Sequence, residues 1–372
     1  MASMRPAAAN VDSRDSASPY GVLDFVAWDH GWNSHHYTPE GIERAAELMR
    51  GAGVGWVRMD FLWVDIEPRP GRFEFERYDR IVATLQARGL SVLGILEYNP
   101  AWRSVPWNTA PEPEAYVRYA RAVVRHFKDR VKYWEIWNEP DQAVYWLPQD
   151  DMAGYSRLLQ RVYPEIKAED PTCKVLVGGL SDGIPFKLRS VYKKAGAGSF
   201  DIVNIHPFSD PLAAQPIREL HSTYAAVKKV MDEFGDGDKP LWFTEIGCPG
   251  VTEKIRENGW WRGTSPDEAE QAAWVNTVYR EALRWPGVEK IFWAFFRDTN
   301  HHWNNGVDYF GLVRNDFSTK PAYDAYRALA TVAPITEPAP PATVPVAHDA
   351  GVASDLGKEP SELHSAEEFS HR

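Results

Sequence analysis

Two glutamates at the ends of apolar runs are the residues of this sequence best suited to chemistry. Glu139 closes the run V-K-Y-W-E-I-W-N-E at 131–139, which breaks at Pro140, and Glu245 closes the run P-L-W-F-T-E at 240–245. Each run is typical of a buried strand that presents a carboxylate at its carboxyl end. Cleavage of a glycosidic bond with retention needs two carboxyl groups about 5–5.5 Å apart, one to protonate the leaving oxygen and one to attack the anomeric carbon. These glutamates predict such a pair if the fold brings them together.

Three polar residues near the ends of predicted strands are candidates to support the pair. Arg58, near the end of a second strand, is a candidate to hold Glu245 ionised, because acid and nucleophile need surroundings that separate their pKa values. Asn138 is a candidate to hydrogen-bond the 2-hydroxyl of a sugar. Glu97 ends a third strand and is expected to contact sugar or to support its polar neighbours. The simpler alternatives are a structural ion-pair role for Arg58 and a turn role for Asn138.

The order of strand and helix patterns along the chain predicts a fold in which the ends of several strands lie close together. Short, nearly continuous apolar runs of the kind found in parallel sheets alternate eight times with helical patterns. We predict strands at 20–28, 54–61, 90–97, 131–138, 174–179, 200–205, 240–246 and 288–295. We predict helices at 39–53, 78–89, 114–128, 151–168, 185–195, 211–234, 266–284 and 321–332.

This alternation is the pattern of a (β/α)8 barrel, the α/β fold also called the TIM barrel, over residues 20–333. The alternative is a doubly wound open sheet, which usually has fewer units and a Gly-rich phosphate loop after its first strand. The sequence has no such loop at that place. In a barrel the carboxyl ends of the strands converge on one face, so Glu139 on strand four and Glu245 on strand seven would face each other across the mouth.

Several motifs resemble those of clan A glycoside hydrolases. The short ones are W-N-E-P at 137–140, T-E-I-G at 244–247, V-R-M-D at 57–60 and F-W-A-F at 292–295. Two longer runs, at 63–75 and 309–323, most resemble glycoside hydrolase family 39, and the resemblance covers about residues 20–333.

That resemblance implies a retaining mechanism on a β-linked glycoside or polysaccharide. It implies that Glu139 is the acid/base and Glu245 the nucleophile. It also implies sugar contacts from Asn138 and His206, and a floor formed by Trp293 beneath the reacting sugar. The alternative for His206 is a core histidine that is hydrogen-bonded by the backbone.

The sequence departs from the family in two places. Many clan members carry a tyrosine near the end of strand six whose hydroxyl bonds the nucleophile, but here the segment at 205–208 reads I-H-P-F. Phe208 cannot donate that bond, so Tyr309 or another residue would have to supply it. The family's β-xylosidases also add a β-sandwich domain, for which the residues after 333 leave too little room. Both departures bear on the substrate more than on the mechanism.

Aromatic residues make up 13% of the chain, with 16 Trp, and some of them are expected to stack on sugar. Trp28, at the end of the first predicted strand, and Trp146, in a βα loop, are candidates for such contacts. Trp134 and Trp242 lie within predicted strands and are expected to pack in the barrel instead.

Composition and spacing exclude several classes of function. The formal net charge of −11 argues against nucleic-acid binding, which needs basic patches. No apolar run reaches the roughly 18 residues of a transmembrane helix. The histidine pairs at 35–36 and 301–302 lack the spacing that aims two imidazoles at one metal ion, so we expect neither a metal nor another cofactor. Cys173 and Cys248 fall at opposite faces of the predicted barrel, so we expect no disulfide between them.

Both ends of the chain differ from the barrel in composition. Residues 1–19 are small and polar and predict a flexible leader without the apolar region of a signal peptide. The tail at 334–372 is rich in proline and acidic residues, so we expect it to be disordered or only loosely docked. On this basis the chain is either cytoplasmic or an exported protein expressed without its signal.

Two other functions compete with a retaining glycosidase. A catalytically silent carbohydrate-binding barrel would use hydrogen bonds and stacking, and the matched pair of glutamates disfavours it. A metal-dependent barrel hydrolase is disfavoured by the missing ligand spacing. The expected partner is a carbohydrate; the sugar, the linkage, internal or terminal cleavage and the oligomeric state are left open by the sequence.

Overall fold

The structure is a computed structural model that describes residues 17–28, 37–254, 256–257, 263–299 and 301–331. The predicted leader lies mostly, and the predicted tail entirely, outside these ranges, so both stay predictions. The histidine pair at 35–36 also lies outside them. None of the described helices combines the length and the apolar character that a transmembrane span requires.

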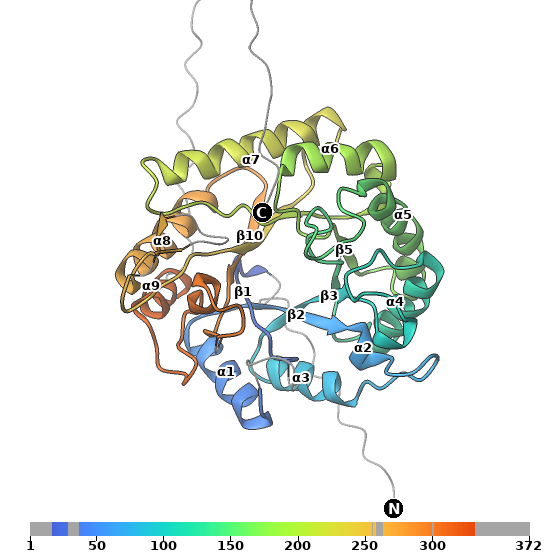
Figure 1. Cartoon of the computed structure of the whole chain (residues 1–372), viewed down its shortest axis with the longest axis horizontal. Helices are drawn as coiled ribbons and strands as arrows, with labels where there is room; N and C mark the ends of the chain where they lie inside the picture. Colours follow the sequence, from blue (N-terminus) through green and yellow to red (C-terminus); the bar gives the residue numbers. More distant parts are fainter. Residues whose placement is uncertain (1–16, 29–36, 255, 258–262, 300, 332–372) are drawn as a thin grey trace, which may run out of the picture. The chain divides into compact units, whose positions relative to one another are not determined.

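The predicted (β/α)8 barrel is confirmed. Eight parallel strands pair in the order β5-β4-β3-β2-β1-β10-β7-β6 and surround a common centre (Figure 1). Isolated parallel bridges from Leu176 to Ile202 and from Leu180 to Ile205 connect the β5 side to the β6 side and close the ring. The strands are β1 (Tyr20–Leu23), β2 (Trp56–Leu62), β3 (Ser91–Glu97), β4 (Tyr133–Ile136), β5 (Lys174–Leu176), β6 (Val203–Ile205), β7 (Leu241–Ile246) and β10 (Val288–Ala294).

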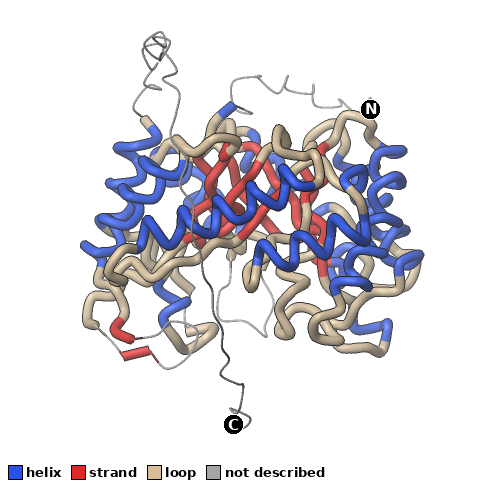
Figure 2. The backbone as a smooth tube through the Cα atoms, turned by 90° about the horizontal axis from the view of Figure 1, so that it is seen from above, coloured by secondary structure: helices blue, strands red, loops and turns tan. Residues whose placement is uncertain are grey.

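Helices cover the outside of this ring, so each strand is buried between the barrel interior and a helical layer (Figure 2). The main helices are α1 (Pro39–Gly51), α3 (Glu76–Gln86), α4 (Pro113–Phe127), α5 (Met152–Glu169), α6 (Ile184–Ala195), α7 (Pro216–Glu233), α8 (Glu268–Ala282) and α9 (Pro321–Ala330). Shorter elements in the connections are α2 (Trp63–Ile66), η2 (Ala101–Arg103), η3 (Ala197–Ser199), η4 (Gly306–Tyr309), β8 (Arg256–Glu257) and β9 (Gly263–Thr264).

The sequence sets helix starts through capping residues. Thr38 caps α1 by accepting a hydrogen bond from the Gly41 backbone N–H at 3.1 Å, and Pro39 occupies the first turn, where its missing N–H costs nothing. Asp267 and Glu270 form a reciprocal capping box at the start of α8. These signals explain why the predicted helix positions agree with the structure to within a few residues in most cases.

Three predicted strands end earlier in the structure than we expected. The first, predicted over 20–28, stops at Leu23, because the Asp24 side chain accepts a hydrogen bond from the Phe25 N–H at 2.8 Å and the chain turns. Strand four stops at Ile136, because Trp137 adopts a φ of 67°. Strand five, predicted over 174–179, stops at Leu176. The extra residues belong to the loops that build the mouth.

Two further elements begin at least three residues later than predicted. The strand predicted from 200 starts at Val203, and the helix predicted from 211 starts at Pro216, a residue favoured in the first turn of a helix. Cys173 and Cys248 are both buried and both free.

Close packing between β3 and β4 depends on Gly94. A Cβ atom at this position would lie 2.6 Å from the Trp134 ring and 2.9 Å from the Phe61 ring, and both rings belong to the hydrophobic core. The aromatic side chains therefore fill the space that a side chain on β3 would need.

We predict that Gly94→Ala lowers the free energy of unfolding by about 1–3 kcal/mol, because added volume in a filled core forces neighbours out of place. Gly198→Ala is the matched control, since a Cβ there meets nothing within 4 Å. Urea unfolding of the two variants measures the difference, and an unchanged Gly94→Ala midpoint would contradict this explanation.

Candidate active site

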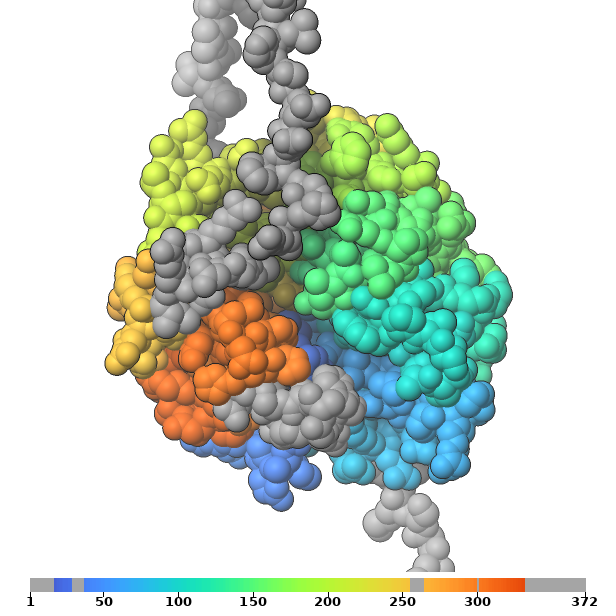
Figure 3. Space-filling view, viewed as in Figure 1, coloured from blue at the N-terminus to red at the C-terminus, as the bar shows by residue number. Residues whose placement is uncertain are grey.

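Glu139 and Glu245 meet at the carboxyl-terminal face of the barrel, as predicted. Glu245 is the fifth residue of β7, and Glu139 follows β4 by three residues. Glu139 has a φ of 43°, and its N–H donates to the Gly178 carbonyl at 2.7 Å, which anchors the turn that aims its side chain inward. The two glutamates retain 8% and 9% of their accessible surface. Figure 3 shows a hollow at the centre of this face, between the segments that follow β3, β4 and β10.

The two carboxyl groups lie close together around His206. The His206 Nδ1 atom is 2.7 Å from Glu139 Oε1 and 3.7 Å from Glu245 Oε1. One oxygen of each carboxylate and one ring nitrogen all lie within 4.8 Å of one another. A retaining pair of carboxyl groups is separated by about 5–5.5 Å and an inverting pair by about 6.5–9.5 Å. The limit of 4.8 Å between these oxygens is shorter than the separation of an inverting pair.

Arg58 is the cation of the site, and it is almost fully buried. Its Nη1 donates to Glu245 Oε1 at 2.5 Å, and its Nη2 donates to Asn138 Oδ1 at 2.9 Å. Its Nε and Nη2 also donate to the two oxygens of Glu135 at 2.7 Å and 2.9 Å. Although burial alone lowers the pKa of Arg58, the charges of Glu135 and Glu245 raise it, so the guanidinium stays charged. The predicted Arg58–Glu245 contact is thus present.

Glu135 is a residue of the site that the sequence analysis missed. It lies in the middle of β4, is fully buried, and receives a bidentate pair of hydrogen bonds from Arg58. Successive side chains of a strand point to opposite faces, so a charged residue between Trp134 and Ile136 must point into the barrel. That alternation is the signal that could have identified Glu135.

The surroundings give the two catalytic candidates different proton affinities. Burial, and then the charges of Glu245 and Asp141, raise the pKa of Glu139 well above its usual value. Burial raises the pKa of Glu245 to about 7, and the Arg58 guanidinium opposes that rise. Glu139 is therefore the group that keeps its proton, and Glu245 is the group that ionises first.

His206 is fully buried and lies against Glu139 rather than in the open mouth. Its Nε2 is 3.1 Å from Thr244 Oγ1, and its Nδ1 is 2.7 Å from Glu139 Oε1. Burial, and then the positive charge of Arg58, lower the pKa of His206 well below its usual value, so the ring is neutral. A neutral ring orients the Glu139 carboxyl group without adding charge. Both ring nitrogens face side chains, so the alternative of a core histidine bonded by the backbone does not describe this position, and the sugar contact of His206 stays a prediction.

Glu97 belongs to an acidic pair beside Arg58. Burial, and then the charge of Asp60 and a hydrogen bond with it, raise the pKa of Glu97 well above its usual value. The Trp28 indole N–H donates to Asp60 Oδ2 at 2.5 Å, which brings Trp28 to the same side of the mouth. Two buried carboxyl groups this close cannot both ionise easily, so the pair shares a proton. Sequence reasoning missed Asp60, although it stands in the motif V-R-M-D.

The remaining predicted contacts are placed as follows. Trp293 is fully buried, and its indole N–H donates to the Phe310 carbonyl at 2.8 Å. Trp146 lies in the hydrophobic core, packed edge-on against Trp137, with only 1% of its surface exposed, so its predicted contact with sugar is not carried into our proposal. Tyr309 lies in η4, where its carbonyl accepts a hydrogen bond from the Gly250 N–H at 2.9 Å.

Metal binding has one candidate cluster in the part of the chain that the structure describes. Glu139, His206 and Glu245 offer ligand atoms at suitable separations. The Glu139 oxygen is already hydrogen-bonded to His206, and Arg58 already supplies a positive charge to Glu245. A metal ion would have to compete with that guanidinium, so the cluster fits acid-base chemistry better than metal binding.

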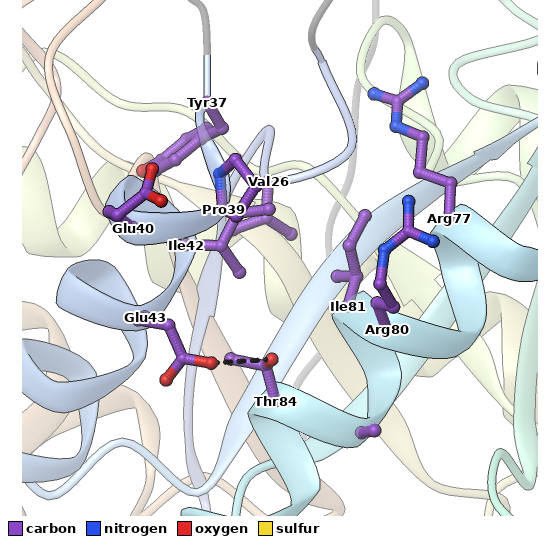
Figure 4. Close-up of a pocket in the computed structure, with 11 residues that line it drawn as sticks. Val26, Tyr37, Pro39, Glu40, Ile42, Glu43, Arg77, Arg80, Ile81 and Thr84 are labelled. Atoms are coloured by element: carbon purple, nitrogen blue, oxygen red, sulfur yellow. Dashed lines mark hydrogen bonds between the residues drawn. The ribbon is translucent and has the colours of Figure 1, made fainter.

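A second cavity of about 450 Å³ lies on the outer side of the barrel. It is formed between α1 and α3, where Ile42 and Ile81 supply apolar walls and Glu43 hydrogen-bonds Thr84 at 3.1 Å (Figure 4). None of its lining residues is a predicted site residue. We therefore do not associate it with the glutamate pair.

We predict that Arg58→Gln lowers the free energy of unfolding by about 3–5 kcal/mol, because it leaves buried carboxylates without a cation. Losing Arg58 raises the pKa values of Glu135 and Glu245 in the folded state further above those of the unfolded chain. The folded state then binds more protons than the unfolded one, so stability falls as pH rises, and the loss is larger at pH 8 than at pH 5.

Urea unfolding at the two pH values measures this loss. Arg44→Gln is the matched control, because the ion pair of Arg44 with Glu47 is 3.9 Å long and exposed to solvent. Its effect should stay below about 1 kcal/mol. An equal loss at both pH values for Arg58→Gln would contradict the assignment of buried carboxylates to this cation.

Comparison with known proteins finds glycoside hydrolases. The glycoside hydrolase family 42 model, described as beta-galactosidase, matches residues 31–94. Beta-glucosidase 47 of Arabidopsis thaliana is 29% identical over 130 residues, which cover 32% of this chain and 23% of that protein. A beta-galactosidase of Thermus thermophilus is 42% identical over 59 residues, which cover 16% of this chain and 9% of that protein. The matched segments are thus only a small part of these relatives.

Solved structures agree over most of the barrel. A family 39 glycoside hydrolase from the gut symbiont Bacteroides cellulosilyticus WH2 superposes with a TM-score of 0.68 at 25% identity, covering 86% of this chain and 64% of that one. A monomeric beta-xylosidase from Caulobacter crescentus CB15 gives a TM-score of 0.64 at 17% identity, covering 86% of this chain and 69% of that one. The resemblance to clan A glycoside hydrolases, and to family 39 in particular, is therefore confirmed.

Proposed function

We propose that this protein is a retaining glycoside hydrolase that cleaves a β-linked glycoside or polysaccharide. One observation carries the proposal: a carboxylate oxygen of Glu139 and one of Glu245 lie within 4.8 Å of each other at the mouth of the barrel. An inverting enzyme needs about 6.5–9.5 Å between its carboxyl groups to admit a water molecule. The similarity to beta-glucosidase, beta-galactosidase and beta-xylosidase supports the β-linkage.

In the first step, Glu139 donates its proton to the glycosidic oxygen while Glu245 attacks the anomeric carbon. The bond between the anomeric carbon and the glycosidic oxygen breaks, the leaving group departs as an alcohol, and Glu245 is left as a glycosyl ester. In the second step, ionised Glu139 takes a proton from water, and the water oxygen attacks the anomeric carbon. The ester bond breaks, the sugar is released with its original configuration, and both glutamates return to their starting states.

The surrounding residues prepare the pair for these steps. Arg58 fixes Asn138 through its Oδ1 atom, so the Asn138 amide presents NH2 as the donor for the sugar 2-hydroxyl. His206 orients Glu139 through a 2.7 Å contact. Trp28 and Glu97 lie on the Asp60 side of the mouth, where we propose that they contact the sugar above the Trp293 floor. Tyr309 stays a candidate for a further contact.

A silent carbohydrate-binding barrel is the weaker alternative. Binding alone requires neither two carboxyl groups at the retaining distance nor surroundings that separate their proton affinities. Glu139 and Glu245 are both buried, Glu139 against His206 and Glu245 against Arg58, an arrangement that costs desolvation free energy and that a binding site does not need.

We predict a bell-shaped dependence of kcat/KM on pH for a p-nitrophenyl β-glycoside. Activity should rise as Glu245 ionises, through about pH 7, and should fall at higher pH as Glu139 loses its proton. Initial rates from pH 4 to pH 10 measure this profile. A maximum near pH 4 would contradict the raised pKa of Glu245.

We predict that Glu245→Ala loses at least about a thousandfold in kcat and regains activity with azide, which can enter the space of the missing carboxylate. Glu139→Gln should slow substrates with poor leaving groups by orders of magnitude more than p-nitrophenyl glycosides, because only the former need the proton. Glu219→Ala, at an exposed position of α7, is the control and should retain normal rates. Equal slowing of both substrates by Glu139→Gln would contradict its role as the acid.

A further inference from the structure

Exposed apolar side chains gather on one part of the barrel mouth. Among the described residues, the large hydrophobic side chains with high exposure all follow strands β3 to β6. They are Val105, Trp107, Val144, Phe186 and Leu212. Trp107 is the largest of them, and 48% of its surface is accessible. Of these five side chains, Trp107 is the one that packs with other aromatic rings beside the site, so it is the candidate for ligand contact.

Three aromatic rings in this region form an edge-to-face cluster around Trp107, which we call the platform and define as Tyr98, Trp107 and Tyr145. The Tyr98 and Trp107 ring centroids are 4.8 Å apart at an interplanar angle of 84°, and Tyr98 and Tyr145 are stacked at 6.4 Å. Trp107 and Tyr145 are 6.3 Å apart at 68°. Tyr98 directly follows β3, Trp107 lies in the β3–α4 loop and Tyr145 lies in the β4–α5 loop.

Hydrogen bonds hold the platform in a fixed place. The Asn99 N–H donates to the Trp107 carbonyl at 2.8 Å, and the Leu147 N–H donates to the Asn108 carbonyl at 2.8 Å. These two bonds fasten the β3–α4 loop to the end of β3 and to the β4–α5 loop. A preorganised surface binds a ligand without the entropy cost of ordering its own loops.

A third bond connects the platform to the acid. The indole N–H of Trp137, two residues before Glu139, donates to the Tyr145 carbonyl at 2.8 Å. The Tyr98 ring also packs edge-on against the Trp137 ring, with centroids 5.4 Å apart. The platform is therefore continuous with the site.

The order of the strands around the barrel indicates which end of a bound substrate would lie on the platform. The platform follows β3 and β4, and in the closed ring these strands lie across from β7 and β10, which carry Glu245 and Trp293. The acid must stand beside the glycosidic oxygen, and the nucleophile beneath the anomeric carbon. The part of the substrate beyond Glu139, on the β3–β4 side, is therefore its leaving group.

We propose that the Tyr98–Trp107–Tyr145 platform binds a pyranose ring on the leaving-group side, so that the substrate is a β-linked oligosaccharide or polysaccharide. This inference rests on the proposed function. Flat aromatic faces complement the C–H faces of a sugar ring and bury a large apolar area. An enzyme for glycosides with small leaving groups would not need three aromatic rings fixed beyond its acid.

The test compares two substrates that share one glycone. β-Xylosyl, β-glucosyl and β-galactosyl fluorides identify the glycone, and fluoride is too small to reach the platform. The second substrates are β-1,3- and β-1,4-linked tetrasaccharides of the same sugar. For Trp107→Ala we expect kcat/KM to fall at least tenfold on the tetrasaccharide that the wild type cleaves, mainly through KM, and to change less than twofold on the fluoride. Trp107→Phe should recover most of the loss.

Phe186→Ala is the matched control, because Phe186 is 72% exposed on the same face but lies outside the platform. The platform proposal would be overturned if Trp107→Ala changed kcat/KM equally on both substrates or on neither. It would also be overturned if Phe186→Ala lost as much kcat/KM on the tetrasaccharide as Trp107→Ala. A changed molar mass of Trp107→Ala in light scattering, with unchanged kinetics, would also overturn it and would assign the rings to contact between protein chains. A wild type that cleaves neither fluorides nor tetrasaccharides would instead refute the proposed function.

Discussion

The site depends on one buried cation. Arg58 reaches from β2 to Glu135 on β4, to Asn138 after β4 and to Glu245 on β7, and so joins three strands that are distant in the sequence. Burying two carboxylates inside a barrel is costly unless a charged and hydrogen-bonded partner offsets the loss of water. Guanidinium suits this position because its planar fork can bind one carboxylate with two parallel bonds and still reach another.

This arrangement explains how two glutamates of the same chemical type can take opposite roles. Glu245 contacts the cation directly, whereas Glu139 contacts a neutral histidine and lies close to other acidic groups. In a medium of low dielectric constant, such differences in charge strongly separate the proton affinities of the two groups. The barrel supplies the required geometry, because carboxyl ends of its strands converge on one face. Loops after β3 and β4 then extend that face beyond the acid.

The fold and the reactive pair could be predicted from the sequence because both depend on local patterns. Apolar runs and capping residues place the strands and helices, and counting the units puts Glu139 on strand four and Glu245 on strand seven. The contacts of Glu135 with Arg58 and of His206 with Glu139 were not predicted, because periodicity tells which face of a strand a side chain takes but not which partner it meets there. Trp146 was a candidate for stacking on sugar and is buried in the structure, because the packing of neighbouring loops decides whether a loop tryptophan faces solvent or core. The substrate could not be predicted either, because it depends on the shape of the barrel mouth, which the periodicity of the sequence does not encode.

Covalent trapping tests the central claim most directly. The protein is incubated with activated 2-fluoro glycosides of xylose, glucose and galactose, for which the fluorine slows hydrolysis of the glycosyl-enzyme ester, and is then digested for mass spectrometry. The account predicts a mass increase of one 2-fluoro sugar on the peptide that contains Glu245, with no label in Glu245→Ala. A label on Glu139 or on any other residue, or no label in an enzyme that hydrolyses the parent glycosides, would contradict it.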